Sequence, residues 1–349
     1  MKFKREEQSR KAILMIQLHP STFVRRDEEM LRSMGPVKVF RFRRQKGIGV
    51  LTELIREKIF LLRNIWTCRL IYVWFADFHT VLPVIFARLT GKKCVVVIGG
   101  VDAAYLPEYQ YGTKTRILGR ISLLLTVRLA HVLLPVSRFT LEDLKRNVSA
   151  RLAAKSIVVH NCYTPALIIP AAQGERELVL TIALASSKRT LFIKGVDVFL
   201  GAAALMDRYK FMVVGLSGEA LEAAQEMAPA NVELHWPVAF EELQEIYSRT
   251  RVICQFSRQE SFGIALLEGL AAGCVPVIAN RCGPAEVFEG SGIPVIDQMD
   301  ADRAAQAISA AMSMDPEKLS AIQKKVLPSF DCTLRQKKLH AVIHNLIRQ

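Results

Sequence analysis

Two glutamates stand eight residues apart in SRQESFGIALLEGLAAGCVPVIA (257–279). Glu260 precedes the pattern of a helix over 263–272, and Glu268 lies inside that pattern. Amides at a helix start have no partner within the helix and carry partial positive charge, so they suit a phosphate. Glu268 could accept both hydroxyls of a ribose, and Glu260 could reach sugar hydroxyls beyond a diphosphate. The residues that we expect at this phosphate are Ser261, Phe262, Gly263 and Ile264.

Two cations lie upstream, five residues apart, in SSKRTLFIKGVDVF (186–199). Arg189 and Lys194 over a diphosphate would neutralise the charge that develops as it leaves with its nucleotide. The predicted catalytic groups are therefore Arg189, Lys194 and Glu260. The alternative is that these residues are ordinary surface charges and helix acids.

The elements that must position these residues form two series of strands and helices. The first series predicts strands at 12–17, 37–42, 70–74, 94–98 and 132–135, with helices at 27–33, 51–62, 79–89, 114–130 and 141–147. The second predicts strands at 178–184, 211–214, 232–235, 252–256, 275–279 and 293–295, with helices at 196–206, 219–226, 240–249, 263–272 and 302–311. Strands of continuous apolar residues indicate parallel sheets covered on both faces. We therefore predict an α/β protein of two doubly wound, Rossmann-type domains.

The composition changes at PALIIPAAQG (165–174), where two prolines and a glycine mark a linker. The predicted domains cover 1–167 and 168–334, with the ligand in the cleft between them. Their charges differ: residues 1–170 hold 29 Lys and Arg against 12 Asp and Glu, a net +17, whereas the remainder has 18 against 21, a net −3. The two halves are therefore expected to meet different partners.

The segment with Glu260 and Glu268 resembles the signature of the GT4-type glycosyltransferases, which have the GT-B fold. The resemblance covers most of the chain and is strongest in the second half, where Arg189 and Lys194 match the cations of the family. FMVVG (211–215) resembles the strand and glycine that flank the base pocket, which adds Gly215 to the donor-binding residues.

The resemblance implies an enzyme that moves a hexose-like sugar from a nucleotide-diphospho-sugar to an acceptor hydroxyl, with retention of configuration. In the family, the first glutamate binds the donor sugar and the second binds the ribose. The first domain would bind the acceptor, the second would bind the nucleotide-sugar, and the helix at about 335–349 would pack back on the first domain.

The first domain departs from the pattern of the family in two places. Many relatives have a Gly-Gly loop after the first strand, where this chain has LHPSTFVRRDEEMLR (18–32), so Ser21 and Thr22 are expected to cap the next helix and offer amides to a phosphate. Many relatives also have a histidine where this chain has Gly99. The amides of Gly99 and Gly100 and the carboxylate of Asp102 are candidates for the sugar side. Asp102 is alternatively a turn residue.

Two histidines are candidates only by position. His19 and His79 lie where an imidazole could replace the missing one, although a satisfied structural histidine is the more common case. His160 is expected to be structural.

No metal or cofactor is expected. Asp300-Ala301-Asp302 matches an Asp-x-Asp metal string but precedes DRAAQAISAAM, which favours a helix cap. The two cations and the helix start would supply positive charge without a metal ion. The seven cysteines are scattered and predict reduced, buried thiols.

The first residues, MKFKREEQSRKA, are charged, and no span of 18 residues is both uncharged and apolar throughout, so we expect a cytoplasmic protein. The basic pair at 25–26 and the run RFRRQK (41–46) have two interpretations. They form either a solvated edge or a patch that contacts anionic lipid or a polyanionic acceptor. The expected partners are a nucleotide-sugar, a glycan or lipid-linked acceptor, and the inner face of a membrane, in cell-surface polysaccharide or glycolipid biosynthesis. Nucleic acid is not expected.

Two other functions fit the same pattern. A nucleotide-sugar epimerase of this fold would need acid and base groups in the first domain, which is poor in them. A catalytically inactive nucleotide-sugar-binding protein is raised by Gly99.

Overall fold

The computed structural model describes residues 11–18, 20–43, 45, 47–169 and 176–348. The chain divides into two compact units, the first made of Met1–Asn161 and Thr333–Gln349 and the second of Cys162–Cys332. The division after Asn161 lies six residues before the boundary at 167/168 that the sequence suggested.

The first unit is built on a five-stranded parallel sheet with the strand order β2-β1-β3-β4-β5. Its strands are β1 (Ala12–Gln17), β2 (Val37–Arg41), β3 (Cys68–Trp74), β4 (Lys93–Ile98) and β5 (Val132–Pro135). Every residue of β1 is buried, as expected for a central strand covered on both faces. The helices of this unit are α2 (Thr22–Arg32), α3 (Ile48–Asn64), α4 (Val81–Leu89), α5 (Ile117–Leu129), α6 (Arg138–Leu144), α7 (Ala150–Ala153) and α16 (Cys332–Arg348).

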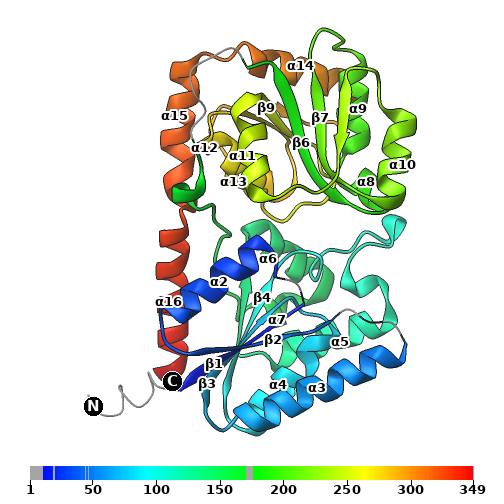
Figure 1. Cartoon of the computed structure of the whole chain (residues 1–349). Helices are drawn as coiled ribbons and strands as arrows, with labels where there is room; N and C mark the ends of the chain where they lie inside the picture. Colours follow the sequence, from blue (N-terminus) through cyan, green and yellow to red (C-terminus); the bar gives the residue numbers. More distant parts are fainter. Residues whose placement is uncertain (1–10, 19, 44, 46, 170–175, 349) are drawn as a thin grey trace. The chain divides into compact units, whose positions relative to one another are not determined.

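The second unit contains a six-stranded parallel sheet with the order β11-β10-β9-β6-β7-β8 (Figure 1). Its strands are β6 (Leu178–Ala185), β7 (Phe211–Leu216), β8 (Val232–His235), β9 (Thr250–Gln255), β10 (Val275–Ala279) and β11 (Val295–Ile296). Its helices are α8 (Lys188–Ile193), α9 (Val196–Ala204), α10 (Gly218–Met227), α11 (Phe240–Arg249), α12 (Ile264–Ala271), α13 (Cys282–Val287), α14 (Ala301–Met312) and α15 (Pro316–Val326). The strand order reverses between β9 and β6, which are neighbours in the sheet but are separated in the chain by β7 and β8, and ligands of such sheets bind at that point.

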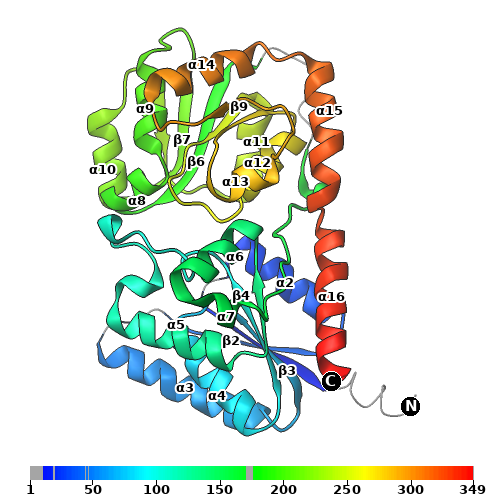
Figure 2. The same cartoon turned by 180° about the vertical axis from the view of Figure 1, so that it is seen from behind.

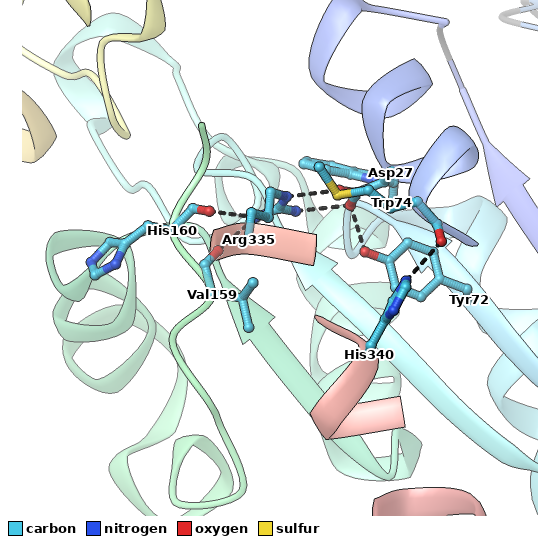
Figure 3. A network of polar contacts seen from close by, with 8 residues as sticks. Asp27, Tyr72, Trp74, Val159, His160, Arg335 and His340 are labelled. Carbon is cyan, nitrogen blue, oxygen red and sulfur yellow. Dashed lines mark hydrogen bonds and ion pairs between the residues drawn. The ribbon is translucent and has the colours of Figure 1, made fainter. Parts of the chain in front are cut away.

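The C-terminal helix α16 is fastened to the first unit by a buried ion pair (Figure 3). Arg335 is 3% exposed, and its Nε and one terminal nitrogen donate to the two carboxylate oxygens of Asp27 on α2 at 2.7 and 2.8 Å. Its other terminal nitrogen donates to the carbonyls of Val159 and His160, both at 2.7 Å. A bidentate pair whose remaining donors are also satisfied avoids the cost of an uncompensated buried charge.

Two aromatic side chains of β3 complete this network. The hydroxyl of Tyr72 donates to Asp27 at 2.5 Å, and the indole nitrogen of Trp74 donates to the same oxygen at 3.0 Å. Burial, together with the negative charge of Asp27, raises the pKa of Tyr72 well above its usual value, so the phenol keeps the proton that it donates.

Helix α3 has the opposite polarity to an ordinary surface helix. Its only acids, Glu53 and Glu57, are buried at 3% and 0% exposure, while five of its apolar side chains are exposed: Ile48, Leu51, Ile55, Ile59 and Leu62. The carboxylate of Glu53 accepts bonds from the amide of Arg43 and the guanidinium of Arg56. Burial would raise the pKa of Glu53, but these two contacts hold it below its usual value.

Glu57 has no such compensation. Neither of its carboxylate oxygens has a hydrogen-bond partner within the described part of the chain. Burial, with a smaller effect from the charge of Glu53, raises the pKa of Glu57 to about 9. Glu57 is therefore a neutral acid at pH 7.

No helix in the described ranges combines the length and the apolar character needed to span a membrane.

Glu57 makes the stability of the first unit depend on pH. The folded protein keeps this carboxyl protonated up to about pH 9, whereas the unfolded chain ionises it near 4.5, so the free energy of unfolding should fall by about 1.4 kcal/mol per pH unit between these values. We predict that Glu57→Gln removes this slope and is about 3 kcal/mol more stable than the wild type at pH 7. Urea unfolding at pH 5, 6, 7 and 8 measures the effect. The exposed Glu108→Gln is the control, and parallel profiles for the wild type and Glu57→Gln would contradict the prediction.

Candidate functional site

The turn between α8 and α9 sets the position of Lys194. Ser187 and Thr190 form a reciprocal capping box that starts α8, and Lys194 ends this helix. Gly195 follows with a φ of 68°, and a Cβ on it would lie 1.7 Å from the carbonyl oxygen of Phe256. Only glycine allows the turn to approach the end of β9 this closely.

An ion pair locks the same turn to the loop after β9. The guanidinium of Arg258 donates to both carboxylate oxygens of Asp197 at 2.8 and 2.7 Å. The amide of Arg258 also donates to the carbonyl of Ile193 at 2.8 Å. Lys194 is thereby held next to the segment that begins the predicted Glu-x7-Glu motif.

Lys194 and Glu260 form an ion pair, with 2.7 Å between Nζ and Oε2. Their side chains are 25% and 18% exposed, so the pair lies in a partly accessible site. Gln255 donates its side-chain amide to the same carboxylate oxygen at 3.2 Å. Burial would raise the pKa of Glu260, but Lys194 and the amides of Ser261 and Phe262 lower it below its usual value. Glu260 is thus an anion that is held ready to accept hydrogen bonds.

The segment 260–263 is clamped from the other side by the start of α13. The amide of Gly283 donates to the carbonyl of Glu260 at 2.8 Å, and a Cβ on Gly283 would lie 2.1 Å from the carbonyl oxygen of Ser261. Cys282 takes the left-handed φ of 67°, and its thiol lies 3.3 Å from the carbonyl of Arg258. Two loops from neighbouring strands therefore fix the backbone around Glu260.

The start of α12 divides the predicted phosphate amides into two groups. The amide of Ser261 donates to Glu260 at 3.0 Å, and Phe262 also supports this carboxylate through its amide. Gly263 has a φ of 88° and precedes Ile264, the first residue of α12. The first amides of a helix have no partner within it, so those of Gly263 and Ile264 are the ones suited to a phosphate.

The side chain of Phe262 belongs to the core. It is 1% exposed and meets the ring of Phe330 edge-on, with 5.3 Å between the centroids. Only its backbone can take part in binding.

Glu268 lies on α12 and is 6% exposed. Its neighbour is Tyr247 of α11, whose pKa is raised well above the usual value, first by burial and then by the charge of Glu268. A phenol that keeps its proton can donate to a carboxylate, so Tyr247 is suited to orient Glu268. Sequence reasoning did not identify Tyr247.

Gly215 is the buried penultimate residue of β7 and has a φ of 109°, and a Cβ on it would lie 2.9 Å from the carbonyl oxygen of Ala183. Strands β6 and β8 flank β7, and Val214 pairs with His235. Two large apolar side chains are exposed at the same strand ends: Leu184 is 68% exposed and Trp236 is 60% exposed. The sequence analysis missed both, although exposed apolar groups at the carboxyl edge of a parallel sheet are a feature of ligand sites.

Arg189 occupies an exposed position on α8, five residues before Lys194. Asp300 accepts the amide of Arg303 at 2.9 Å and caps α14, as predicted.

The expected sugar-side groups of the first unit require a correction. Asp102 is 1% exposed and accepts the amides of Ala76, Gly99 and Gly100 at 3.0, 3.2 and 2.7 Å. Burial is the largest influence on the pKa of Asp102 and raises it. The amides of Gly99 and Gly100 are therefore already used, and the open alternative, that Asp102 is a turn residue, is the one that the structure supports.

Phe75 occupies the space beside Gly99. A Cβ on Gly99 would lie 2.2 Å from an edge carbon of the Phe75 ring, so no side chain fits there unless that ring moves. Phe75 has a left-handed φ of 69°, which is unusual for a bulky residue, and its ring contacts those of Phe23 and Trp74. In this chain an aromatic ring covers the position at which many relatives are expected to have an imidazole.

The structure also places three of the other four candidates of the first unit, namely Ser21, Thr22 and His79. Ser21 precedes α2 in an extended conformation, but its side chain forms no capping bond, and Thr22 is the exposed first residue of the helix. His79 is 0% exposed and its Nε2 lies 2.9 Å from the carbonyl oxygen of Trp74, so it is a core residue and cannot replace the missing histidine. His19 lies outside the described residues.

Comparison with known proteins identifies a family that matches this part of the chain. The sequence profile of the family described as Glycosyl transferases group 1 matches residues 181–326, which include Arg189, Lys194, Glu260 and Glu268. A D-inositol 3-phosphate glycosyltransferase of Corynebacterium urealyticum is 34% identical over 145 residues, 37% of this chain. The match covers only about a third of that protein, 34% of its length.

Solved structures match nearly the whole chain. A sucrose-phosphate synthase from Thermosynechococcus elongatus has a TM-score of 0.76 and 16% identity, covering 97% of this chain and all of the other. The Anabaena protein HepE, solved in complex with UDP-glucose, has a TM-score of 0.72 and 15% identity, covering 96% of this chain and all of the other. These likenesses confirm the predicted GT-B fold class.

The close approach at Gly195 provides a test of the site. We predict that Gly195→Ala forces the turn away from Phe256, which displaces Lys194, lowers the melting temperature by several degrees and weakens nucleotide-sugar binding at least tenfold. Gly91→Ala is the matched control, because Gly91 has nearly the same φ of 67° but open space around its Cβ, so it isolates the backbone cost of about 1–2 kcal/mol. Thermal melts and titration calorimetry compare the two variants. Equal effects of both substitutions on stability and binding would show that the close contact between Gly195 and Phe256 does not position Lys194.

Proposed function

We propose that the chain, whose residues 181–326 match the profile of the group 1 glycosyltransferases, transfers a sugar from a nucleotide-diphospho-sugar to an acceptor hydroxyl. The reaction would retain the configuration of the anomeric carbon. The observation that supports this proposal most is the Lys194–Glu260 pair next to the open amides of Gly263 and Ile264. It sets a cation, an anion and a helix start together, as a phosphorylated sugar requires.

In this proposal the donor lies along the strand ends of the second unit. The diphosphate is neutralised by Arg189, Lys194 and the helix start, and Glu260 accepts hydroxyls of the sugar. When the bond between the anomeric carbon and the phosphate oxygen breaks, negative charge grows on the diphosphate, and fixed cations stabilise that change. The proposal includes no metal requirement, because these groups supply the positive charge.

The nucleoside occupies the rest of the donor site. Glu268, oriented by Tyr247, accepts the ribose hydroxyls, and the base lies at the strand ends beside Gly215, where β7 packs closely against β6. Trp236, whose large ring is exposed, provides an apolar face for the base.

The donor and the acceptor are proposed only as classes. UDP-glucose is the first donor to test, since the structurally similar HepE was solved with it. The acceptor would be a glycan or a lipid-linked sugar in cell-surface polysaccharide or glycolipid biosynthesis, at the inner face of an anionic membrane. Of the basic pair predicted to contact that surface, Arg25 is exposed but Arg26 is buried, so the pair is not a continuous charged patch.

An inactive nucleotide-sugar-binding protein is the second candidate, favoured by the Phe75 ring beside Gly99. An epimerase is disfavoured, since it would need acid and base groups in the first unit, and Asp102 and His79 there are both buried in structural roles. Incubation with UDP-, GDP-, ADP- and CMP-sugars separates the three. Nucleotide release that depends on an acceptor supports transfer, interconverted sugar without an acceptor supports an epimerase, and binding without turnover supports the inactive protein.

Lys194 and Glu260 should be needed for turnover. We predict that Lys194→Ala and Glu260→Ala each lower kcat at least tenfold, because each removes charge stabilisation or sugar positioning that is realised in the transition state. Lys210→Ala and Glu226→Ala, which alter exposed residues of the same unit, should leave the rate unchanged. Nucleotide release is measured with the donor found in the screen. A wild-type rate in either site variant would refute the catalytic assignment.

Trp236 should contribute to nucleotide affinity. We predict that Trp236→Ala weakens binding of the nucleoside diphosphate about tenfold, while Trp236→Phe retains most of the affinity, because stacking needs only an aromatic face. Trp66→Ala, which removes an exposed tryptophan of the other unit, is the control for titration calorimetry. Equal affinities for the wild type and Trp236→Ala would place the base elsewhere.

A further inference from the structure

We propose that the outer face of helices α3 and α5 is a docking surface for an anionic lipid bilayer. The inference deepens the proposed membrane location and does not depend on the proposed sugar transfer. It identifies a different surface from the basic runs that the sequence suggested.

The exposed side of α3 is a continuous apolar stripe. At about 100° per residue its members fall within about 80° of arc, which a helix in a water-facing position does not normally present. The opposite side of the helix carries Glu53 and Glu57, both buried. The stripe, with exposures between 42% and 85%, consists of Ile48, Leu51, Ile55, Ile59 and Leu62.

Trp66 extends the stripe just beyond the end of α3 and is 70% exposed. An exposed indole at the end of an apolar stripe is typical of side chains that sit at the boundary between lipid headgroups and acyl chains.

Helix α5 repeats the arrangement. Five of its apolar side chains are exposed by between 37% and 80%: Ile117, Leu118, Ile121, Leu124 and Leu125.

The two stripes lie in one helical layer. Helix α4 contacts both α3 and α5, and both views show the three helices together on the side of the first sheet away from α2 and α16 (Figures 1 and 2). The outward sides of α3 and α5 therefore form one face, which we call the α3–α5 face.

The charges of the α3–α5 face decide what covers it. Helices α3, α4 and α5 contain no acid except the buried Glu53 and Glu57, whereas their exposed cations include Arg56, Lys58, Arg63, Arg120 and Arg128. Lys58 lies on one side of the α3 stripe, and Arg56 and Arg63 lie on the other. Cations beside an apolar stripe match a membrane surface, where lipid phosphates bind the cations and acyl chains receive the apolar groups.

A second copy of the chain matches less well. A two-fold interface places the same patch on both partners, so two acid-free faces would bring arginines toward arginines. An anionic bilayer satisfies both the apolar stripe and the cations on its flanks.

Vesicle sedimentation of the full chain tests the proposal. The wild type should bind vesicles of phosphatidylcholine with 30% phosphatidylglycerol at 50 mM NaCl, and less at 500 mM, because salt screens the cations. The double variant Ile55→Glu/Ile59→Glu should lower the bound fraction at least tenfold. Leu205→Glu, at an equally exposed apolar position of the second unit, should bind like the wild type. Melting temperature and nucleotide-sugar affinity should not change in either variant, which separates a failure of docking from a failure of the proposed transfer.

A second readout locates the contact. In Trp236→Phe the exposed tryptophan of the second unit is removed, Trp74 is buried, and Trp66 becomes the reporter. Brominated lipids should then quench the fluorescence. Equal sedimentation of the wild type and the double variant, or sedimentation without quenching, would overturn the proposal. A dimer in vesicle-free solution that the double variant dissociates would also overturn it and assign the face to a second copy.

Discussion

The ion pair between Lys194 and Glu260 is the contact on which the donor site depends. Lys194 and Glu260 follow different strands of the sheet. The position of Lys194 depends on the close backbone approach at Gly195, and the position of Glu260 depends on that at Gly283; only glycine permits either approach. The carboxylate of Glu260 accepts hydrogen bonds from the amides of Ser261 and Phe262. The amides of Gly263 and Ile264, at the start of α12, are then the ones suited to a phosphate. One charged contact thus orders the sugar end and the phosphate end of the site together.

This arrangement explains why the second unit was the more predictable half. Glu260, Glu268 and Lys194 could be selected from their spacing, since a motif that binds one compact ligand is short in sequence. Their partners could not, because Gln255, Tyr247 and Arg258 are ordinary residues whose roles arise only when β9, α11 and α12 pack side by side. Helix α8 was also missed. Its six residues are too few for a periodic pattern, and its start depends on the reciprocal bonds of Ser187 and Thr190.

The first unit shows the limit of the same reasoning. Its sheet was predictable, because continuous apolar strands leave few alternatives, and the strand ranges at 12–17 and 132–135 match the structure. The hydrogen-bond partners of its polar side chains were not predictable. Asp102 was a candidate ligand, yet it accepts two amides of its own loop and the amide of Ala76 in the loop after β3. Helix α3 would be expected to bury its apolar stripe, but it buries Glu57 instead. The proposed contact with a bilayer gives that exposed stripe a partner outside the protein.

The central claim is that Lys194 binds the diphosphate while Glu260 binds the sugar. Titration calorimetry with a nucleoside diphosphate and with the matching nucleotide-sugar tests it directly. Lys194→Ala should weaken both ligands about tenfold, or about 1.4 kcal/mol, whereas Glu260→Gln should weaken only the nucleotide-sugar by that amount. Equal losses of both ligands in Glu260→Gln, or no loss in Lys194→Ala, would contradict the account.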